Sequence, residues 1–434
     1  MPVAHNIDNW SSKAAIIHQR LSNKRRWMLF VTASTFAIFM ISQWCIALTM
    51  LGQVHAEIPR TIINSSGLFT VSFVTTQFAS YRMASISVYR LVGQVLSSWL
   101  LIIVIGLALM LLLRFDYSFW YSACAFVIGT ACLGGFAHNL VKRHSQTIGV
   151  PGDGLLSAVN AKDITHFIAL DGPTLPDTPI DAIAVEQHHL SDPAWTPFLS
   201  WCAINAVPVL IINDYLERHS GKVDMENFAL GDALRIRAMR PYLSFKRVTD
   251  IVIGVTALVL LAVPLAITAL VIKLESRGPA LFTQRRLGRG GRPFTIYKFR
   301  SMRTDAEVKG AQFATSSDPR ITRIGRYIRK SRIDELPQLF NVIRGDMSLI
   351  GPRPEQVKLM DGLVKEIPLF PLRHSVRPGI TGWAQVCQGY ADDVASTREK
   401  VSYDLFYIKN VSVILDLNIV LRTIRIIISG FGAR

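Results

Sequence analysis

Asp334 and Glu335 are adjacent carboxylates in a basic stretch of the sequence, with Arg329 and Arg332 before them and Arg353 after them. Carboxylates among arginines, with room for a divalent ion, are typical of phosphoryl-transfer sites, because the cations stabilise phosphate charge. An aspartate can act as the nucleophile in such reactions and form an acyl phosphate. The alternative is structural, since an aspartate at this position can simply cap a helix.

A proline and a glycine mark the helix that should carry this pair. Pro337 is typical of a first helical turn, and Gly345 is typical of the position just after a helix ends. The two carboxylates then lie at a helix N-terminus, whose positive end favours negative charge.

The segment 277–330 holds 14 basic residues and 3 acidic ones, and we expect it to supply phosphate-binding cations. Within it, residues 296–302 alternate like a strand that places Lys298 and Arg300 on one face, and Arg303 follows in the next turn. Two neighbouring cations suit a diphosphate. The same face could instead be solvated or lie on anionic lipid.

Two loops rich in glycine and proline hold further candidates. Residues 346–355 fix the backbone around Arg353, so its side chain loses little entropy on binding. In residues 377–385, Trp383 could stack on a base or a sugar, with Gln385 as a second candidate contact. For a tryptophan considered alone, burial in the core is the more frequent outcome.

The composition indicates a membrane protein with a basic second half. Half of the 434 residues are hydrophobic, and the mean hydropathy is +0.31, which excludes a disordered, collagen-like or coiled-coil chain. Residues 241–434 hold 30 basic and 16 acidic residues, so they carry +14 of the net charge of +16. Such a charge implies an anionic partner. The five cysteines form no C-x-x-C pair, so we expect neither a disulfide framework nor a zinc site.

Four apolar segments in the first third of the chain have the length needed to cross a membrane: Trp27–Leu51, Ile62–Ser80, Leu91–Leu113 and Phe119–His138. We expect no signal peptide, since basic residues precede a first apolar segment that is too long for one. The distribution of Lys and Arg predicts that both ends of this bundle face the cytoplasm. We therefore expect a four-helix transmembrane bundle over residues 1–145, with everything after about residue 140 in the cytoplasm.

Residues 146–240 predict a small α/β domain. Ile164–Leu170, Ile180–Val185 and Val207–Ile212 are typical of buried strands, and residues 193–206 have the length of a helix. The glycines at 149, 152 and 154 have the spacing G-x-x-G-x-G, which differs from the dinucleotide-binding pattern G-x-G-x-x-G. A structural or regulatory domain is therefore favoured over nucleotide binding.

The apolar segment Val248–Ile272 opens the third domain, residues 241–434, which we expect to be mixed α/β and mainly helical. A straight span would move the most basic part of the chain across the membrane, although both of its flanks are basic. Pro264 offers a bend, so we predict a re-entrant helix that leaves on the side it entered. The alternative is a kinked helix that spans. Residues 415–431 predict an interfacial amphipathic helix or, alternatively, a core helix.

At these residues the sequence resembles the bacterial sugar transferases called polyprenyl-phosphate hexose-1-phosphate transferases, or monotopic phosphoglycosyl transferases. The larger members of that family also have an N-terminal transmembrane bundle. The matches run in order through residues 240–434: Lys246-Arg247 with Asp250, Pro264, Gly278-Pro279 with Phe282, Gln284 and Arg286, Lys298-Phe-Arg-Ser-Met302, Asp318-Pro-Arg320, Asp334-Glu-Leu-Pro-Gln338, Gly345 to Pro354, Pro378 to Val386, Tyr403-Asp404 with Tyr407-Ile408, and Asp416.

The resemblance implies an enzyme of the bacterial inner membrane, with its catalytic domain on the cytoplasmic face. It would transfer hexose 1-phosphate from a UDP-sugar to undecaprenyl phosphate and release UMP, in the first step of exopolysaccharide, capsule or O-antigen assembly. The sugar is expected to be glucose, from the size class of the chain alone. Membrane lipids and a second copy of the chain are further expected partners, and nucleic acid is not.

The resemblance also implies roles for individual residues. Asp334 would be the nucleophile, and Glu335 would help Asp334 to hold Mg²⁺. Lys298, Arg300, Arg303, Arg329 and Arg353 would bind phosphates. Cys387 departs from the asparagine expected after Gln385-Val386, which puts a uridine or sugar contact at this position in doubt. The rival interpretation is a non-catalytic lipid-binding protein that regulates a polysaccharide assembly complex.

Overall fold

The structure is a computed structural model, and it describes residues 3–51, 60–84, 91–143, 146–152, 165–226, 228, 240–303, 320–357, 360–388 and 394–429. Gly154 and Asp318, from two of the sequence motifs, lie outside these residues. The chain forms two compact units, Met1–Ser220 and Gly221–Arg434, and each is described by itself.

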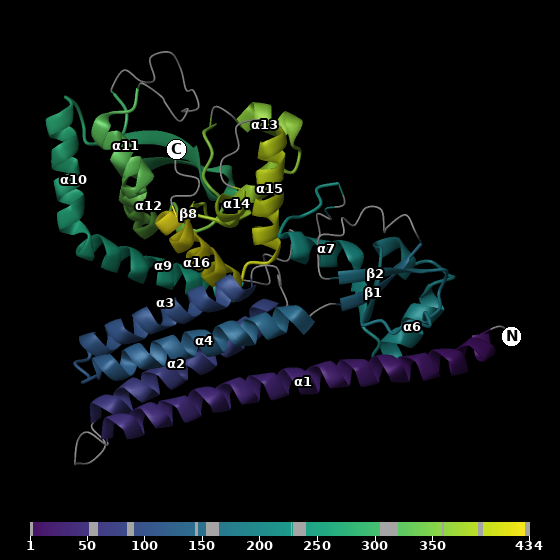
Figure 1. Cartoon of the computed structure of the whole chain (residues 1–434). Coiled ribbons are helices and arrows are strands. Elements are labelled where there is room, and N and C mark those ends of the chain that lie inside the picture. The colour runs from purple at the N-terminus through teal and green to yellow at the C-terminus, as the bar shows by residue number, and fades with distance from the viewer. Residues whose placement is uncertain are drawn as a thin grey trace. The chain divides into compact units, whose positions relative to one another are not determined.

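Four long helices form a bundle in the first unit (Figure 1): α1 (Val3–Leu51), α2 (Arg60–Ala84), α3 (Leu91–Leu112) and α4 (Phe119–Arg143). Trp99 is buried at its centre and lies edge-on to Phe39 and Phe73, which stack on each other with ring centroids 4.1 Å apart. Many large apolar side chains on the outside of the bundle are exposed, as expected for helices whose solvent is lipid.

Two of the four predicted spans are confirmed as helices long and apolar enough to cross a membrane, within Trp10–Met50 and Phe119–Leu140. In α3 the apolar stretch among the described residues is the shorter segment Ser98–Leu112. Helix α2 buries Ser65, Ser72 and Thr76 and is less apolar. Crossing by α2 and α3 therefore stays a prediction.

Helix α1 begins 24 residues before the predicted span and packs on the α/β part of the unit. Trp10, Ala14 and Ile17 are buried in the same apolar cluster as Phe198 and Leu199. Farther along the helix, Lys24 and Arg20 form ion pairs with Asp181, at 2.8 and 3.3 Å. In the sequence, these two cations belong to the basic residues whose distribution predicts the orientation of the bundle. In the structure they also fasten α1 to the domain that follows.

The α/β part contains a four-stranded parallel sheet in the order β2-β1-β3-β4. Its elements are β1 (Gln146–Pro151), β2 (Thr165–Leu170), β3 (Ala182–Val185), η2 (Gln187–Leu190), α6 (Thr196–Ile204), β4 (Val209–Ile211) and α7 (Ile212–Ser220). The three predicted strands and the helix α6 are confirmed. Strand β1 was missed because Gly149 and Pro151 are unfavourable in strands. Gly149 lies inside β1, where an added Cβ would approach the Leu170 side chain at 3.0 Å.

A bent pair of helices lies near the start of the second unit. Helix α9 (Arg240–Leu260) and helix α10 (Ala262–Glu275) meet at 63° across Leu261 (Figure 1). Pro264 explains the position of the bend: it cannot donate to the carbonyl of Leu260, and its ring would clash with that carbonyl in a straight helix. The predicted break at Pro264 is therefore found, and the pair together is apolar enough to be a broken span or a re-entrant loop.

Short elements follow the bent pair. They are β5 (Leu281–Leu287), η4 (Arg289–Gly291), β6 (Pro293–Phe299), α11 (Arg323–Lys330), η5 (Ile333–Gln338), α12 (Leu339–Arg344), β7 (Ser348–Ile350), α13 (Met360–Glu366), η7 (Phe370–Ser375), β8 (Gly379–Thr381), α14 (Trp383–Cys387), α15 (Val394–Lys409) and α16 (Val413–Ser429). Strands β5 and β6 form an antiparallel hairpin, and β7 and β8 pair in parallel.

A buried polar cluster fastens α9 to the core of this unit. The carboxylate of Asp416 accepts hydrogen bonds from Lys246, Tyr242 and Tyr407. In the same core, α16 buries Leu415 and Ile419 completely, so its first half is a core helix and the interfacial alternative is wrong there. Helix α9 is thus held against the domain that carries the carboxylate pair.

Candidate active site

Asp334 and Glu335 lie in the 3₁₀ turn η5, directly before α12. Arg332 precedes the turn in the left-handed region, with a φ of 58°, which is uncommon for a residue other than glycine. Such a conformation costs about 1–3 kcal/mol and is characteristic of functional sites. At the other end, Gly345 ends α12 with a φ of 102°, as its predicted C-terminal position requires.

Glu335 is buried and surrounded by cations. Its carboxylate accepts a 2.6 Å hydrogen bond from Nη2 of Arg353, and it forms further ion pairs with Lys298 at 3.5 Å and Arg332 at 3.8 Å. Burial by itself raises the pKa of Glu335, but Arg353 and Lys298 outweigh it and hold this pKa well below the usual range. Glu335 is therefore ionised throughout the physiological pH range.

Asp334 has the opposite character although it is the next residue. Its Oδ1 is buried and has no hydrogen-bond partner in the described part of the chain. Burial, and then the negative charge of Glu335, raise the pKa of Asp334 to about 6, against the opposing effect of Lys298, Arg353 and Arg329. An unpartnered buried oxygen is unfavourable for stability but leaves this carboxylate available to react.

Lys298 comes from strand β6 and reaches the same cluster. Burial, together with the charges of Arg353 and Arg286, lowers its pKa to about 8, against the opposing effect of Glu335. In the sequence, Arg286 is notable only as one of the residues that carry the family resemblance. In the structure its Nη1 donates to the carbonyl of Pro354 at 3.0 Å, so Arg286 supports the loop that carries Arg353.

A buried ion network holds the backbone of Arg353 in position. Arg373 donates to Glu355 at 2.9 Å, to Asp404 at 2.6 Å and to the backbone carbonyl of Arg353 at 3.1 Å, and Lys400 donates to Glu355 at 2.6 Å. The Arg373 side chain is only 1% exposed. Sequence reasoning missed Arg373, because nothing next to it in the sequence marks it as part of the site.

The predicted phosphate-binding residues fall into two groups. Lys298 and Arg353 contact the carboxylate pair directly, and Arg329 is close enough to affect the pKa of Asp334. Arg303 is exposed, and no contact between its side chain and the carboxylate pair is found within the described part of the chain. Arg300 is a correction: its guanidinium is buried and donates to the carbonyls of Ser276 and Arg277, at the end of α10. Arg300 therefore caps a helix, and it lies just after β6, which ends at Phe299 and not at the predicted residue 302.

The structure also corrects the predicted contacts of Trp383 and Gln385 with a uridine or a sugar. Trp383 is 4% exposed, donates through Nε1 to the carbonyl of Gly221 and stacks against Phe406, so it belongs to the core. Gln385 donates to the carbonyl of Ile380. Cys387, where an asparagine was expected, accepts a hydrogen bond from Arg422 in the same region. None of the three contacts the Asp334 cluster in the described residues, so a uridine or sugar contact by them has no support.

The carboxylate pair is also a candidate binding site for Mg²⁺. The described residues contain no group of three or more His, Cys, Asp or Glu side chains that could hold a metal ion. Mg²⁺ nevertheless binds in many enzymes through one or two carboxylates together with substrate phosphates and water. The unpartnered Oδ1 of Asp334 fits that mode of binding. Glu335 fits it less well because arginines and Lys298 already pair with its oxygens.

Comparison with known proteins places this site in a family. The sequence profile of the bacterial sugar transferases matches residues 241–430, which include the whole cluster. The chain is 44% identical over 188 residues to an exopolysaccharide production protein of Rhizobium leguminosarum bv. phaseoli and covers 94% of that protein. The chain belongs to the bacterial sugar transferase family.

Two longer relatives of this family carry more specific names. A UDP-N-acetylgalactosamine-undecaprenyl-phosphate N-acetylgalactosaminephosphotransferase of Aeromonas hydrophila is 48% identical over 267 residues. A UDP-glucose:undecaprenyl-phosphate glucose-1-phosphate transferase of Escherichia coli K12 is 42% identical over 181 residues. The matches cover 61% and 41% of this sugar transferase, and 63% and 39% of the relatives. The chain therefore spans less than two thirds of either relative.

Proposed function

We propose that the protein transfers a hexose 1-phosphate from a UDP-sugar to undecaprenyl phosphate and releases UMP. The observation that carries the proposal is the pair of adjacent carboxylates with opposite environments: Glu335 is fixed by cations, and Asp334 keeps a buried oxygen without a partner. The names of the Aeromonas and Escherichia relatives support the donor and the acceptor.

The proposed reaction has two displacements. A carboxylate oxygen of Asp334 attacks the β-phosphorus of the UDP-sugar, the bond from that phosphorus to the bridging oxygen breaks, and UMP leaves with the electron pair. The product is an acyl phosphate between Asp334 and the sugar phosphate. An oxygen of undecaprenyl phosphate then attacks the same phosphorus and releases Asp334, which leaves the sugar diphosphate on the lipid.

The cations around the pair have distinct parts in this scheme. Lys298, whose pKa is about 8, is mainly charged at pH 7 and stabilises the negative charge that develops on the phosphoryl oxygens. Arg353 pairs with Glu335, and its backbone carbonyl accepts a hydrogen bond from Arg373. Its guanidinium therefore presents fixed donors to the diphosphate. Arg329 adds a third charge near Asp334.

We further propose that Asp334 and Glu335 hold Mg²⁺ together with the donor phosphates. When bound, the ion would neutralise phosphate charge and favour departure of UMP. The test is a Mg²⁺ titration of UMP release with Glu335→Gln. Substantially lower activity and a weaker dependence on Mg²⁺ are expected. An unchanged titration curve would exclude Glu335 from the metal site.

The membrane position follows from the lipid acceptor. The phosphate of undecaprenyl phosphate stays at the membrane surface, so a re-entrant α9–α10 pair would hold the site at that level. The 63° bend and the exposed apolar side chains of Val248, Val252 and Val259 support this proposal. We place the catalytic unit on the cytoplasmic face of the bacterial inner membrane. Cysteine labelling from outside intact cells should miss residues 280–429, and labelling there would refute the re-entrant topology.

The donor sugar is a separate part of the proposal. We predict glucose, and the Aeromonas relative makes N-acetylgalactosamine the rival. UMP release from UDP-glucose and UDP-N-acetylgalactosamine, each with undecaprenyl phosphate, distinguishes them. The lipid-linked product would then start a polysaccharide repeat unit. Release of no UMP from any UDP-hexose, by a folded protein that still binds lipid, would favour the non-catalytic rival.

A further inference from the structure

Three arginines surround a hollow of the second unit that has no part in the proposed reaction. It has a volume of about 430 Å³ and is lined by Leu243, Ser244, Arg247, Arg289 and Arg377. Ligand pockets of small molecules begin at roughly 300 Å³, so this size is sufficient for a head group. We call these five residues the arginine hollow.

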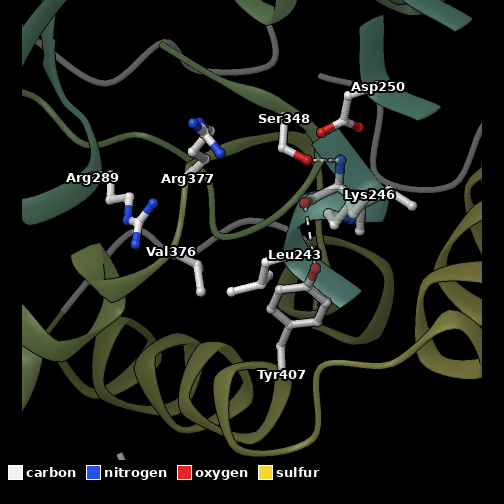
Figure 2. Close-up of a pocket in the computed structure, with 9 residues that line it drawn as sticks. Leu243, Lys246, Asp250, Arg289, Ser348, Val376, Arg377 and Tyr407 are labelled. Carbon is white, nitrogen blue, oxygen red and sulfur yellow. Dashed lines mark hydrogen bonds between the residues drawn. The ribbon is translucent and has the colours of Figure 1, made fainter. Parts of the chain in front are cut away.

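A narrower inner cavity adjoins the arginine hollow and shares Leu243, Arg289 and Arg377 with it. Figure 2 shows Arg289 on one side of this inner part and Asp250 and Ser348 on the other. The Asp250 carboxylate accepts a hydrogen bond from the backbone N–H of Leu349 at 3.1 Å. Asp250 lines only the inner cavity, and the charged side chains that line the arginine hollow are all arginines.

Two of the three guanidinium groups have a structural reason to be there, and the third does not. Arg247 donates to the carbonyls of Val342 and Ile343, and Nε of Arg377 donates to the carbonyl of Gly345, so both cap the C-terminal end of α12. Arg289 is exposed, and the structure gives it no ion pair among the described residues. Helix capping therefore does not account for a third positive charge at this point.

The three charges are close enough to affect one another. Burial lowers the pKa of Arg377, and the charges of Arg247 and Arg289 lower it further, against the opposing effect of the Asp250 carboxylate in the inner cavity. Guanidinium groups that repel one another are stabilised when an anion with several oxygens lies between them. Nε of Arg377 bonds to Gly345, and its terminal nitrogens, which have no acceptor among the described residues, can donate to such an anion.

The arginine hollow is separate from the carboxylate pair. Arg247 and Arg377 lie at the C-terminal end of α12, whereas Asp334 and Glu335 lie in the turn before its N-terminal end. The six residues of α12 extend about 9 Å at 1.5 Å per residue. A group bound in the hollow therefore does not take the place of the donor diphosphate.

The surroundings of the hollow indicate a lipid. Ser244 and Arg247 are in α9, where the exposed apolar side chains of Phe245, Val248 and Val252 lie on the same few turns. A ring of arginines beside an exposed apolar surface is the arrangement that binds phospholipid head groups. A phosphate in the hollow could keep its acyl chains along that apolar surface.

We propose that the arginine hollow binds the phosphate of an anionic phospholipid and so fixes the depth of α9 in the membrane surface. The test uses the full chain, purified in a neutral detergent, and native mass spectrometry of retained lipid. The wild-type protein should retain phosphatidylglycerol in preference to phosphatidylcholine. Arg289→Gln should weaken this binding about tenfold, as expected for loss of a charge-assisted hydrogen bond.

Arg292→Gln is the matched control. Arg292 follows Arg289 in the same hairpin loop and is exposed, but it does not line the hollow. Its substitution should change phosphatidylglycerol binding less than about twofold. UMP release in detergent should be the same for both variants and the wild type, which shows that they are folded and separates this result from the proposed transfer reaction.

Inorganic phosphate identifies the source of the anion. If the wild type does not distinguish the two lipids, and phosphate raises its melting temperature but not that of Arg289→Gln, the hollow binds soluble phosphate and the lipid proposal is overturned. If Arg289→Gln and Arg292→Gln retain phosphatidylglycerol equally, the anion site itself is rejected.

Discussion

Two clusters of buried carboxylates in the second unit differ in how completely they are paired. In the cluster around Arg373, Glu355 and Asp404 both receive short hydrogen bonds from that arginine. In the cluster around Arg353, Glu335 is paired in the same way, but Oδ1 of Asp334 has no partner in the described residues. The first arrangement stabilises the fold, and the second leaves one reactive group unsatisfied.

The difference shows that the energetically unfavourable features of this domain lie at the proposed reactive site. A buried ion pair contributes to stability only when its geometry is good and its hydrogen bonds are satisfied. In the Arg373 cluster both carboxylates are hydrogen-bonded, and of the arginine's own nitrogens only the buried Nε has no partner among the described residues. Arg373 also donates to the backbone carbonyl of Arg353. The left-handed backbone of Arg332 and the unpartnered oxygen of Asp334 are unfavourable features nearby, and the Arg373 cluster holds the adjoining loop of Arg353 in place.

The largest effect should follow from neutralising Asp334. Asp334→Asn removes the nucleophile, so UMP release should fall by at least about 10³-fold. The protein should remain as stable as the wild type or become more stable. Asp177→Asn is the control, because Asp177 lies on the surface of the first unit with a 97% exposed side chain. Substantial activity in Asp334→Asn would exclude this residue as the nucleophile.

The next largest effect should follow from removing Arg373, the central cation of its cluster. Arg373→Gln leaves Glu355 and Asp404 buried without their partner, which should lower the free energy of unfolding by about 3–5 kcal/mol. Denaturant unfolding in detergent measures this change. Arg326→Gln, at an exposed position of α11, should have almost no effect. Equal stability of the two variants would contradict the structural role of the Arg373 cluster.

The pH dependence of stability distinguishes the two clusters again. The folded-state pKa of Asp334 is raised from 3.8 to about 6, so its stability contribution is fully present below pH 4 and is lost as the pH rises through 6. In EDTA at pH 8, Asp334→Asn should therefore be more stable than the wild type by up to about 3 kcal/mol. Below pH 4 the difference should vanish. A difference that does not depend on pH would contradict the raised pKa.

The smallest effect should come from a cation that the fold leaves outside the cluster. Arg303→Gln should change UMP release less than about twofold, as a surface substitution away from the site does. Lys298→Gln, which removes a cation paired with Glu335, should lower it by about 10²-fold. Similar losses in the two variants would show that Arg303 reaches the donor phosphates after all.

Local sequence signals were sufficient for much of this domain. Pro337 and Gly345 marked the helix after the carboxylate pair, Pro264 marked the bend between α9 and α10, and alternation marked strand β6. Each of these features depends on a backbone preference that acts within a few residues. The presence of arginines around the carboxylate pair could be inferred for a similar reason, because Arg329 and Arg332 are close to it in the sequence.

Tertiary structure alone decided the uses of the remaining arginines. The sequence gives Arg300, Arg353 and Arg373 the same chemistry, yet one caps α10, one pairs with Glu335 and one binds Glu355 and Asp404 from a buried position. A guanidinium group can satisfy carbonyls, carboxylates or phosphates equally well. Which of these it meets depends on chain segments far apart in sequence, and only the packing of α10, α12 and α15 determines that.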